Sequence, residues 1–318
     1  HLTPFICLNY PGLTKTGCWC IMFIMVISVN GGEQMHKVQA RGILSNSNGM
    51  NIYRGCTHGC VYCDSRSECY QMAHDFEDVE VKENAPQLLE QALRSRRKRC
   101  MIGTGSMCDP YLHAEKELQL TRRCLELISR YEFGVSLLTK SDLVMRDIDL
   151  LEEINRKTKA VVQMTLTTFD LCRIIEPHVC ATSRRFEVLC EMHERGIPTV
   201  IWLSPLLPFI NDTEENILGI LDYAHRAGCV GVMAFGMGLT LREGSREYFY
   251  KALDEHFPGL KERYMQRFVN YYELPSPDTA RLLKLFHQKC AEYGMLHDPE
   301  SIFAYLREFP ECEQLTLF

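Results

Sequence analysis

Three cysteines with the spacing C-x3-C-x2-C lie in one short segment, Arg54-Gly55-Cys56-Thr57-His58-Gly59-Cys60-Val61-Tyr62-Cys63-Asp64. Three thiolates on one loop can ligate three irons of a cubane iron–sulfur cluster. Gly55 and Gly59 allow the backbone to wrap closely round such a cluster. The segment therefore predicts a [4Fe–4S] site whose protein ligands are Cys56, Cys60 and Cys63.

A cubane held by three cysteines keeps one iron without a protein ligand. S-adenosylmethionine can chelate that iron through its amino and carboxylate groups. An electron from the cluster then cleaves the sulfonium and yields a 5′-deoxyadenosyl radical. In such chemistry the cofactor carries the reaction, while the protein positions it and excludes quenchers.

Other metal sites use cysteines as well. A structural zinc site usually takes four Cys or His ligands, and His58 or Cys69 is available as the fourth. A ferredoxin-type site needs a fourth cysteine in its motif and a much smaller fold. A non-catalytic zinc or iron–sulfur protein is therefore the alternative from another functional class.

Short apolar runs, each of four to seven residues and bounded by Gly, Pro or polar residues, recur from about residue 50. Such runs are typical of buried parallel strands. The predicted strands are Met50–Tyr53, Cys100–Gly103, Gly134–Thr139, Ala160–Leu166, Pro198–Leu203 and Val230–Phe235. Apolar residues at helical spacing predict helices between them over Glu115–Arg130, Arg146–Asn155, Thr182–Glu194 and Thr213–Ala227.

Strand–helix repeats in series predict an α/β fold with a parallel sheet. Right-handed crossovers can close this sheet into a full or partial barrel, and a doubly wound sheet is the competing layout. After Gly238 the pattern is mostly helical, over Ser245–His256, Leu260–Asn270, Pro277–Tyr293 and Pro299–Phe309. We predict a barrel over residues 35–240 and a helical extension, packed on it, over residues 241–318.

Residues 1–34 are expected to be a translated leader or a disordered segment. Their apolar run, Cys18–Val29, is shorter than the ~20 residues needed to span a bilayer. It also lacks the flanks of a signal peptide. Met35 follows a Gly-Gly-Glu segment that purine-rich codons of the bacterial ribosome-binding type would encode, so we predict a native start at Met35.

The bulk composition gives no general attraction to nucleic acid or anionic lipid, because the formal net charge of the 318 residues is −6. The 16 cysteines are irregularly spaced and lie mostly in apolar segments, which indicates reduced, buried thiols. We therefore expect a reducing compartment, the cytoplasm, and no membrane partner. The basic run from Arg94 to Arg99 is interpreted as a solvated helix end.

The cysteine segment resembles the radical S-adenosylmethionine superfamily, whose hallmark is this spacing with an aromatic residue, here Tyr62, before the third cysteine. More narrowly, the chain resembles the spore photoproduct lyase-related branch, often named DNA repair photolyase-like. The resembling segments are Asn51–Asp64, Gly103–Tyr111, Thr139–Asp149, Thr165–Pro177 and Ser204–Asp212. The resemblance implies a partial (β/α)6 TIM-like barrel with a mostly helical C-terminal extension. It also implies a [4Fe–4S] cluster, S-adenosyl-L-methionine, and an electron donor such as flavodoxin or ferredoxin.

The resemblance further implies cofactor contacts at the strand ends, beside Tyr62. Gly103, Thr104 and Gly105 correspond to the family's glycine-rich segment near the methionine amino group, with an ordinary tight turn as the alternative. Lys140 corresponds to a lysine that contacts the cofactor, with a solvated lysine as the alternative.

The same comparison places the hydroxyl of Thr165 near the ribose, with Thr167 as a near competitor. Asn211 and Asp212 follow the fifth predicted strand. They either line the substrate side or only cap the next helix.

The hydrogen-relay residues of spore photoproduct lyase are matched only in part. The position of its hydrogen-donating cysteine falls on Ser106, and Cys108 lies two residues later. Tyr62 matches the first of its two relay tyrosines, but the second falls on Asp64. We therefore do not expect repair of spore photoproduct itself, and Cys108 is either a hydrogen donor or a buried structural thiol.

The substrate is unidentified at this stage. Nucleic acid is the leading hypothesis, by resemblance alone. Radical modification of a peptide or a small metabolite with the same cofactor is the alternative.

Overall fold

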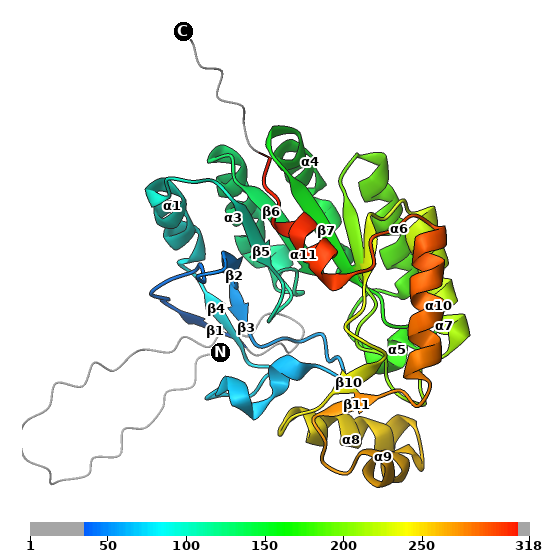
Figure 1. The fold of residues 1–318 in the computed structure, drawn as a ribbon. Coiled ribbons are helices and arrows are strands. Elements are labelled where there is room, and N and C mark those ends of the chain that lie inside the picture. The colour runs from blue at the N-terminus through cyan, green and yellow to red at the C-terminus, as the bar shows by residue number, and fades with distance from the viewer. Residues whose placement is uncertain (1–34, 311–318) are drawn as a thin grey trace, which may run out of the picture.

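A computed structural model describes residues 35–310, so the predicted leader at residues 1–34 lies outside the described residues. Six parallel strands form the central sheet in the order β2-β5-β6-β7-β8-β9 (Figure 1). They are β2 (Gly49–Met50), β5 (Met101–Thr104), β6 (Gly134–Thr139), β7 (Ala160–Thr165), β8 (Thr199–Trp202) and β9 (Gly231–Met233). Because the spatial order follows the chain order and β2 and β9 lie at opposite edges, the sheet is a partial (β/α)6 barrel, as predicted.

Helices connect the strands and cover the outer face of the barrel (Figure 1). They are α1 (Ala85–Ser95), α2 (Glu115–Leu118), α3 (Leu120–Arg130), α4 (Ile148–Lys157), α5 (Cys172–Ile175), α6 (Thr182–Glu194) and α7 (Glu214–Arg226). Short 3-10 segments are η1 (Asp64–Arg66), η2 (Glu68–Tyr70) and η3 (Asp142–Asp147). The helix predicted over residues 115–130 is interrupted at Gln119, whose φ of 50° is left-handed.

The predicted strand Met50–Tyr53 is wrong as a single element. Its first residue ends β2, whereas Tyr53 begins β3 (Tyr53–Arg54), which belongs to a separate three-stranded sheet. In that sheet β4 (Val79–Lys82) lies between β3 and β1 (Met35–Val38), antiparallel to the first and parallel to the second. The chain therefore leaves the barrel through the small sheet immediately before it enters the cysteine segment.

The C-terminal extension is mostly helical and packs on the barrel. Its helices are α8 (Ser245–His256), α9 (Leu260–Phe268), α10 (Thr279–Glu292) and α11 (Pro299–Arg307). Its strand β11 (Glu273–Pro275) pairs antiparallel with β10 (Gly238–Thr240), which precedes the extension, and the sequence predicted neither strand. Phe249 of α8 and Tyr264 of α9 share one hydrophobic cluster with Cys60 and Tyr62, so this extension supports the cysteine segment.

The interior of the barrel is filled in layers. At the end where the strands begin, strand residues and α11 form one apolar cluster, whose buried members are Met101, Val161, Val200, Met233, Ile302 and Leu306. Above it, the Gln163 amide donates to the Ser136 hydroxyl at 2.8 Å and accepts from the Trp202 indole at 2.8 Å. These filled layers leave the carboxyl ends of the strands as the open end of the barrel.

No helix within residues 35–310 is long and apolar enough to cross a membrane.

Candidate metal centre

A cavity of about 310 Å³ lies at the carboxyl ends of the barrel strands. Most of the predicted site residues line it, from segments far apart in the sequence: Cys56, Cys60, Tyr62, Cys63, Gly105, Cys108, Lys140 and Thr165. Gly103 and Thr104 are not among its lining residues. Within the glycine-rich segment only Gly105 therefore borders the cavity.

The backbone of the cysteine segment is held at several points. The Cys56 N–H donates to the Phe76 carbonyl at 3.0 Å, and the Val61 N–H donates to the Ile175 carbonyl at 3.0 Å. Gly55 has a φ of +89°, and a Cβ at this position would lie 2.5 Å from the Phe76 oxygen. Glycine is therefore required immediately before Cys56.

The three motif thiols suit an iron–sulfur cluster. None of the three cysteines is in a disulfide, and all three line the same cavity from one loop. Thiolate is the form that binds iron. This donor set leaves a cubane with one iron for an external chelator, and the neighbouring Lys140 and Thr165 are polar groups of the kind that hold a small polar ligand.

Cys108 lies directly beside Cys56. Its thiol donates to the Gly55 carbonyl at 2.7 Å. The interaction with the neighbouring Cys108 thiol lowers the pKa of Cys56 to about 6 despite burial, which favours the thiolate form of Cys56. Burial raises the pKa of Cys108 itself well above its usual value, so this sulfur keeps its proton.

Asp109 joins three strand-end segments, and the sequence analysis did not identify it as a site residue. Its carboxylate accepts from the Thr139 hydroxyl, from the Lys140 N–H and from the Tyr111 N–H, at 2.7, 2.7 and 2.9 Å. It also lies 3.5 Å from Nδ1 of His58, inside the cysteine segment. An Asp that accepts from the N–H two residues later forms an Asx-turn, which is the one local signal that the sequence offered.

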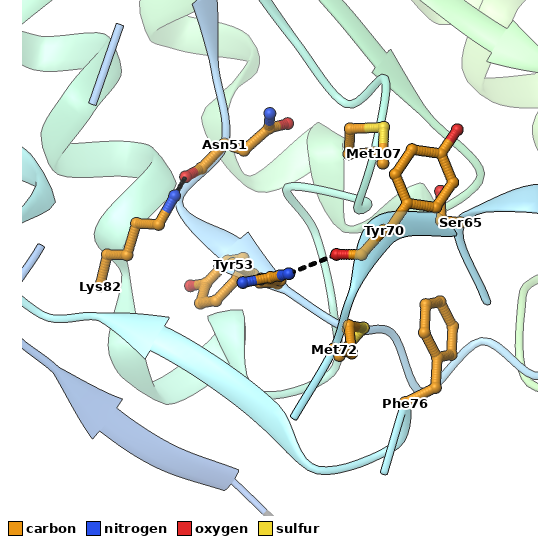
Figure 2. A pocket seen from close by; sticks show the side chains of 10 residues that line it. Asn51, Tyr53, Ser65, Tyr70, Met72, Phe76, Lys82 and Met107 are labelled. Carbon is orange, nitrogen blue, oxygen red and sulfur yellow. Dashed lines mark hydrogen bonds between the residues drawn. The ribbon is translucent and has the colours of Figure 1, made fainter. Parts of the chain in front are cut away.

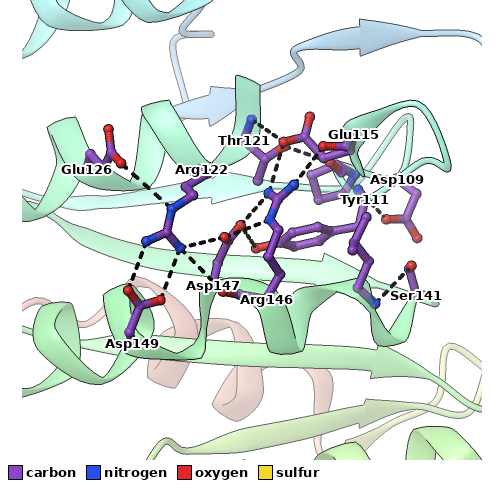
Figure 3. Close-up of polar contacts among 12 residues, drawn as sticks. Asp109, Tyr111, Glu115, Thr121, Arg122, Glu126, Ser141, Arg146, Asp147 and Asp149 are labelled. Carbon is purple, nitrogen blue, oxygen red and sulfur yellow. Dashed lines mark hydrogen bonds and ion pairs between the residues drawn. The ribbon is translucent and has the colours of Figure 1, made fainter. Parts of the chain in front are cut away.

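A charged network lies beneath Tyr111 and fixes the segment after Asp109 (Figure 3). The Arg146 guanidinium contacts the carboxylates of Asp147 and Glu115 at 2.6 and 3.1 Å. Arg122 contacts Asp147 and also Asp149, both at 2.9 Å. Because Glu115 and Asp147 are fully buried, these arginines compensate charges that would otherwise be costly.

A second buried network lies beside the cysteine segment. The Tyr62 hydroxyl donates to Glu176, which also pairs with Arg185 at 2.5 Å. Arg185 donates to the Thr165 carbonyl at 2.7 Å, which connects this ion pair to the end of β7. Burial alone would disfavour the Lys140 ammonium, but the charges of Cys60 and Glu176 hold the pKa of Lys140 above its usual value. Lys140 is therefore a cation at the cavity wall.

The residues proposed at the ends of the later strands differ in their contacts. Thr167 is fully buried, and its hydroxyl lies 3.4 Å from Glu176 rather than at the cavity. The Asn211 side chain accepts from the Leu207 N–H at 2.6 Å and donates to the Thr167 carbonyl at 2.7 Å. Asp212 accepts from Ser276 at 2.6 Å. Neither Asn211 nor Asp212 lines the cavity, and the cap of α7 is Thr213.

A side pocket of about 170 Å³ adjoins the main cavity (Figure 2). Ser65, Tyr70 and Met107 line both. Within the side pocket the Lys82 ammonium donates to the Asn51 carbonyl at 2.8 Å. Phe76, whose carbonyl holds Cys56, forms part of its wall, so this pocket lies against the outer side of the cysteine segment.

The family model of the Radical SAM superfamily matches residues 50–224 of this chain. These residues run from β2 to α7 and include the three motif cysteines, Asp109, Lys140 and Glu176. The match covers more than half of the chain.

Two relatives of similar sequence are named as uncharacterized proteins. A protein of Mycobacterium tuberculosis is 29% identical over 259 residues, covering 78% of this chain and 75% of the relative. A protein of Methanocaldococcus jannaschii is 34% identical over 172 residues, covering 53% of this chain and 63% of the relative.

Among solved structures, this chain is similar to spore photoproduct lyase complexed with dinucleoside spore photoproduct. The TM-score is 0.61 at 11% identity, over 81% of this chain and 79% of that one. A variant of the lyase with bound AdoMet and the same dinucleoside gives a TM-score of 0.56 at 12% identity, over 76% and 72% of the two chains. At this identity the likeness is one of fold.

Proposed function

The chain belongs to the radical SAM superfamily, and from this premise we propose that Cys56, Cys60 and Cys63 hold its [4Fe–4S] cluster in an enzyme that abstracts a hydrogen atom from a substrate. When bound, the cluster supplies the electron that cleaves S-adenosylmethionine to methionine and a 5′-deoxyadenosyl radical. The observation that carries the proposal is that three free thiols of one loop line a single cavity at the open end of a parallel barrel.

The residues round the cavity have separate roles in this proposal. Lys140 supplies a positive charge for the cofactor carboxylate, and Gly105 allows close backbone approach. Thr165 offers a hydroxyl at the end of β7. Asp109 and Glu176 hold Lys140 and Tyr62 in place.

The test is anaerobic reconstitution with iron and sulfide, followed by reduction and measurement of 5′-deoxyadenosine. A brown protein that releases 5′-deoxyadenosine from S-adenosylmethionine supports the proposal. A colourless protein that binds zinc at the motif cysteines and never cleaves S-adenosylmethionine overturns it. The reaction needs an electron from outside the protein, and we propose flavodoxin or ferredoxin as its donor. In the assay a chemical reductant takes the place of this donor protein.

Substitution of Lys140 by glutamine is expected to raise the KM for S-adenosylmethionine about 10- to 100-fold. A hydrogen bond to a charged group contributes about 1.5–3 kcal/mol, and the amide keeps the size but not the charge. The assay is 5′-deoxyadenosine formation at varied cofactor concentration. Lys159→Gln is the control, since Lys159 contacts Tyr305 and Glu308 of the C-terminal segment. An unchanged KM in Lys140→Gln would remove Lys140 from cofactor binding.

We propose nucleic acid as the substrate class. The support is the fold shared with a lyase solved in complex with a dinucleoside. The reaction need not be the same, because Ser106 and Asp64 stand where two of the three lyase relay residues are expected. DNA that increases 5′-deoxyadenosine formation, with hydrogen transfer from the nucleotide, supports this class. Stimulation only by a peptide or small metabolite would replace it.

Substitution of Cys108 by alanine is expected to leave cofactor cleavage within about twofold while it changes the distribution of products. Cys108 keeps its proton beside the motif and lines the cavity, so it can return a hydrogen atom to a product radical. The measurement is deuterium incorporation and product ratio in D₂O, because a thiol exchanges its hydrogen with solvent. The same products in wild type and Cys108→Ala would make Cys108 a structural thiol.

A further inference from the structure

Three side chains with metal-binding atoms meet on the small sheet, outside the cavity of the cysteine motif. They are His36 of β1, His74 of the loop before β4, and Glu80 of β4. One ligand atom from each lies within 4.8 Å of the other two. In the parallel ladder His36 is the register partner of Glu80, so both side chains project from the same face.

Both histidines are oriented as metal ligands usually are. Nδ1 of His36 lies 3.0 Å from the Asp78 carboxylate, and Nδ1 of His74 lies 3.1 Å from the Asp75 carbonyl. These oxygens only accept, so each Nδ1 carries a hydrogen, and Nε2 is the nitrogen through which the neutral imidazole binds a metal. Most metal-bound histidines donate their other ring N–H to a carboxylate or a backbone carbonyl, which fixes the orientation of the ring in this way.

Nε2 of His74 is the atom that most needs a partner. Among the described residues it is one of only three buried side-chain nitrogen or oxygen atoms without a hydrogen bond. Glu80 is its nearest charged neighbour, at 3.9 Å, which is beyond hydrogen-bond length. A buried nitrogen left in this state costs free energy, whereas a cation between His74 and Glu80 would use both lone pairs.

We propose that His36, His74 and Glu80 bind a zinc ion. Two imidazoles and one carboxylate form a ligand set that suits Zn²⁺, with water in the remaining position. The three side chains are 13–20% exposed, so an ion can reach the site while losing much of its hydration. This site shares no residue with the cysteine motif.

The location gives the ion a structural role for the cysteine segment. Phe76, two residues after His74, accepts the hydrogen bond from the Cys56 N–H. Arg54, two residues before Cys56, is the register partner of Glu80. A zinc ion on His74 and Glu80 would therefore fix the segment that accepts from the Cys56 N–H and the strand pairing of Arg54, just before Cys56.

The full chain is purified and reconstituted without oxygen, incubated with Zn²⁺ and desalted. Its metal content is then measured by mass spectrometry. The expected result is one zinc per chain beside the cluster iron, and its loss in His74→Ala and in the isosteric Glu80→Gln. Asp78→Asn is expected to weaken zinc binding about 10- to 100-fold, since Asp78 orients His36. His287→Ala, an exposed histidine of α10, is the matched control and should keep the zinc.

A second measurement excludes zinc held by thiolates of the motif. The triple variant Cys56→Ala, Cys60→Ala, Cys63→Ala is expected to lose iron and keep its zinc, even if the proposed radical chemistry proves wrong. Zinc should also raise the melting temperature of this triple variant, and Glu80→Gln should abolish the shift. Three results would each overturn the proposal. The first is an equal zinc content in wild type, His74→Ala and Glu80→Gln. The others are loss of zinc in the triple cysteine variant and absence of zinc from wild type.

Discussion

Replacement of Cys60 by alanine is expected to abolish 5′-deoxyadenosine formation, with a loss of at least about 1000-fold, or about 4 kcal/mol in the barrier. Cys60 is 7% exposed and lies between the other two cysteines of the motif, on the wall of the cavity. Without its thiolate a cubane has two irons that lack a protein ligand, so the cluster should not persist. Iron and sulfide content, visible absorbance and product formation provide the measurements.

Cys290→Ala is the control for loss of a buried thiol. Cys290 is fully buried in α10, far along the chain from the motif, and burial is the sole cause of its raised pKa. This variant is expected to keep full iron content and activity. If Cys60→Ala still held a complete cluster and cleaved S-adenosylmethionine, the proposed ligand set would be wrong.

Replacement of Arg185 by alanine is expected to lower the free energy of unfolding by about 3–5 kcal/mol. Arg185 and Glu176 are both fully buried and pair at 2.5 Å, so removal of the guanidinium leaves the buried carboxylate beside Tyr62 without its ion-pair partner. The large loss of stability comes from the buried Glu176 carboxylate that has lost its partner, rather than from the net contribution of the ion pair to the free energy of unfolding. Urea unfolding of the cluster-free protein provides the measurement.

The adjacent Arg184 supplies a matched control. Its guanidinium contacts Asp142, Glu187 and Glu191 at the surface, where it is 36% exposed. Surface ion pairs of this kind contribute about 0–1 kcal/mol, so Arg184→Ala should change stability little. A double variant, Glu176→Leu with Arg185→Met, should recover most of the loss because it removes both charges. Equal destabilisation by Arg184→Ala and Arg185→Ala would contradict this account of the buried pair.

Elements with strong local signals could be predicted from the sequence. The bounds of β6, α6 and α8 agree with the predicted ranges Gly134–Thr139, Thr182–Glu194 and Ser245–His256. The hydroxyl of Thr213, the first residue of the predicted range Thr213–Ala227, caps α7, and Gly228 follows that helix with a φ of +61°. Periodicity and caps are encoded in neighbouring residues, which explains this agreement.

Elements defined by distant partners could not be predicted. β2 and β3 are two residues each and belong to different sheets, which no local apolar run can indicate. β10 and β11 pair with each other across more than thirty residues of intervening chain, and each is three residues long. Their existence depends on tertiary pairing rather than on propensity.

The candidate site divides in the same way. The cysteines form a spaced motif, and the family resemblance implied Lys140, which follows β6, and Thr165, which ends β7. Glu176 contacts Tyr62 from 114 positions away in the chain, and no spacing rule connects them. Residues that hold the motif in place were therefore missed, although residues of the motif were found.

The packing of α11 against the lower layer of the barrel has a kinetic consequence. Ile302 and Leu306 cover that end in the described chain, and the cavity lined by the motif cysteines lies at the opposite end. Two reactants that enter this cavity from the same end must bind in sequence, with the deeper molecule loaded first and released last. We therefore expect ordered kinetics, in which the sulfonium nucleoside precedes the substrate and 5′-deoxyadenosine leaves after the substrate has departed.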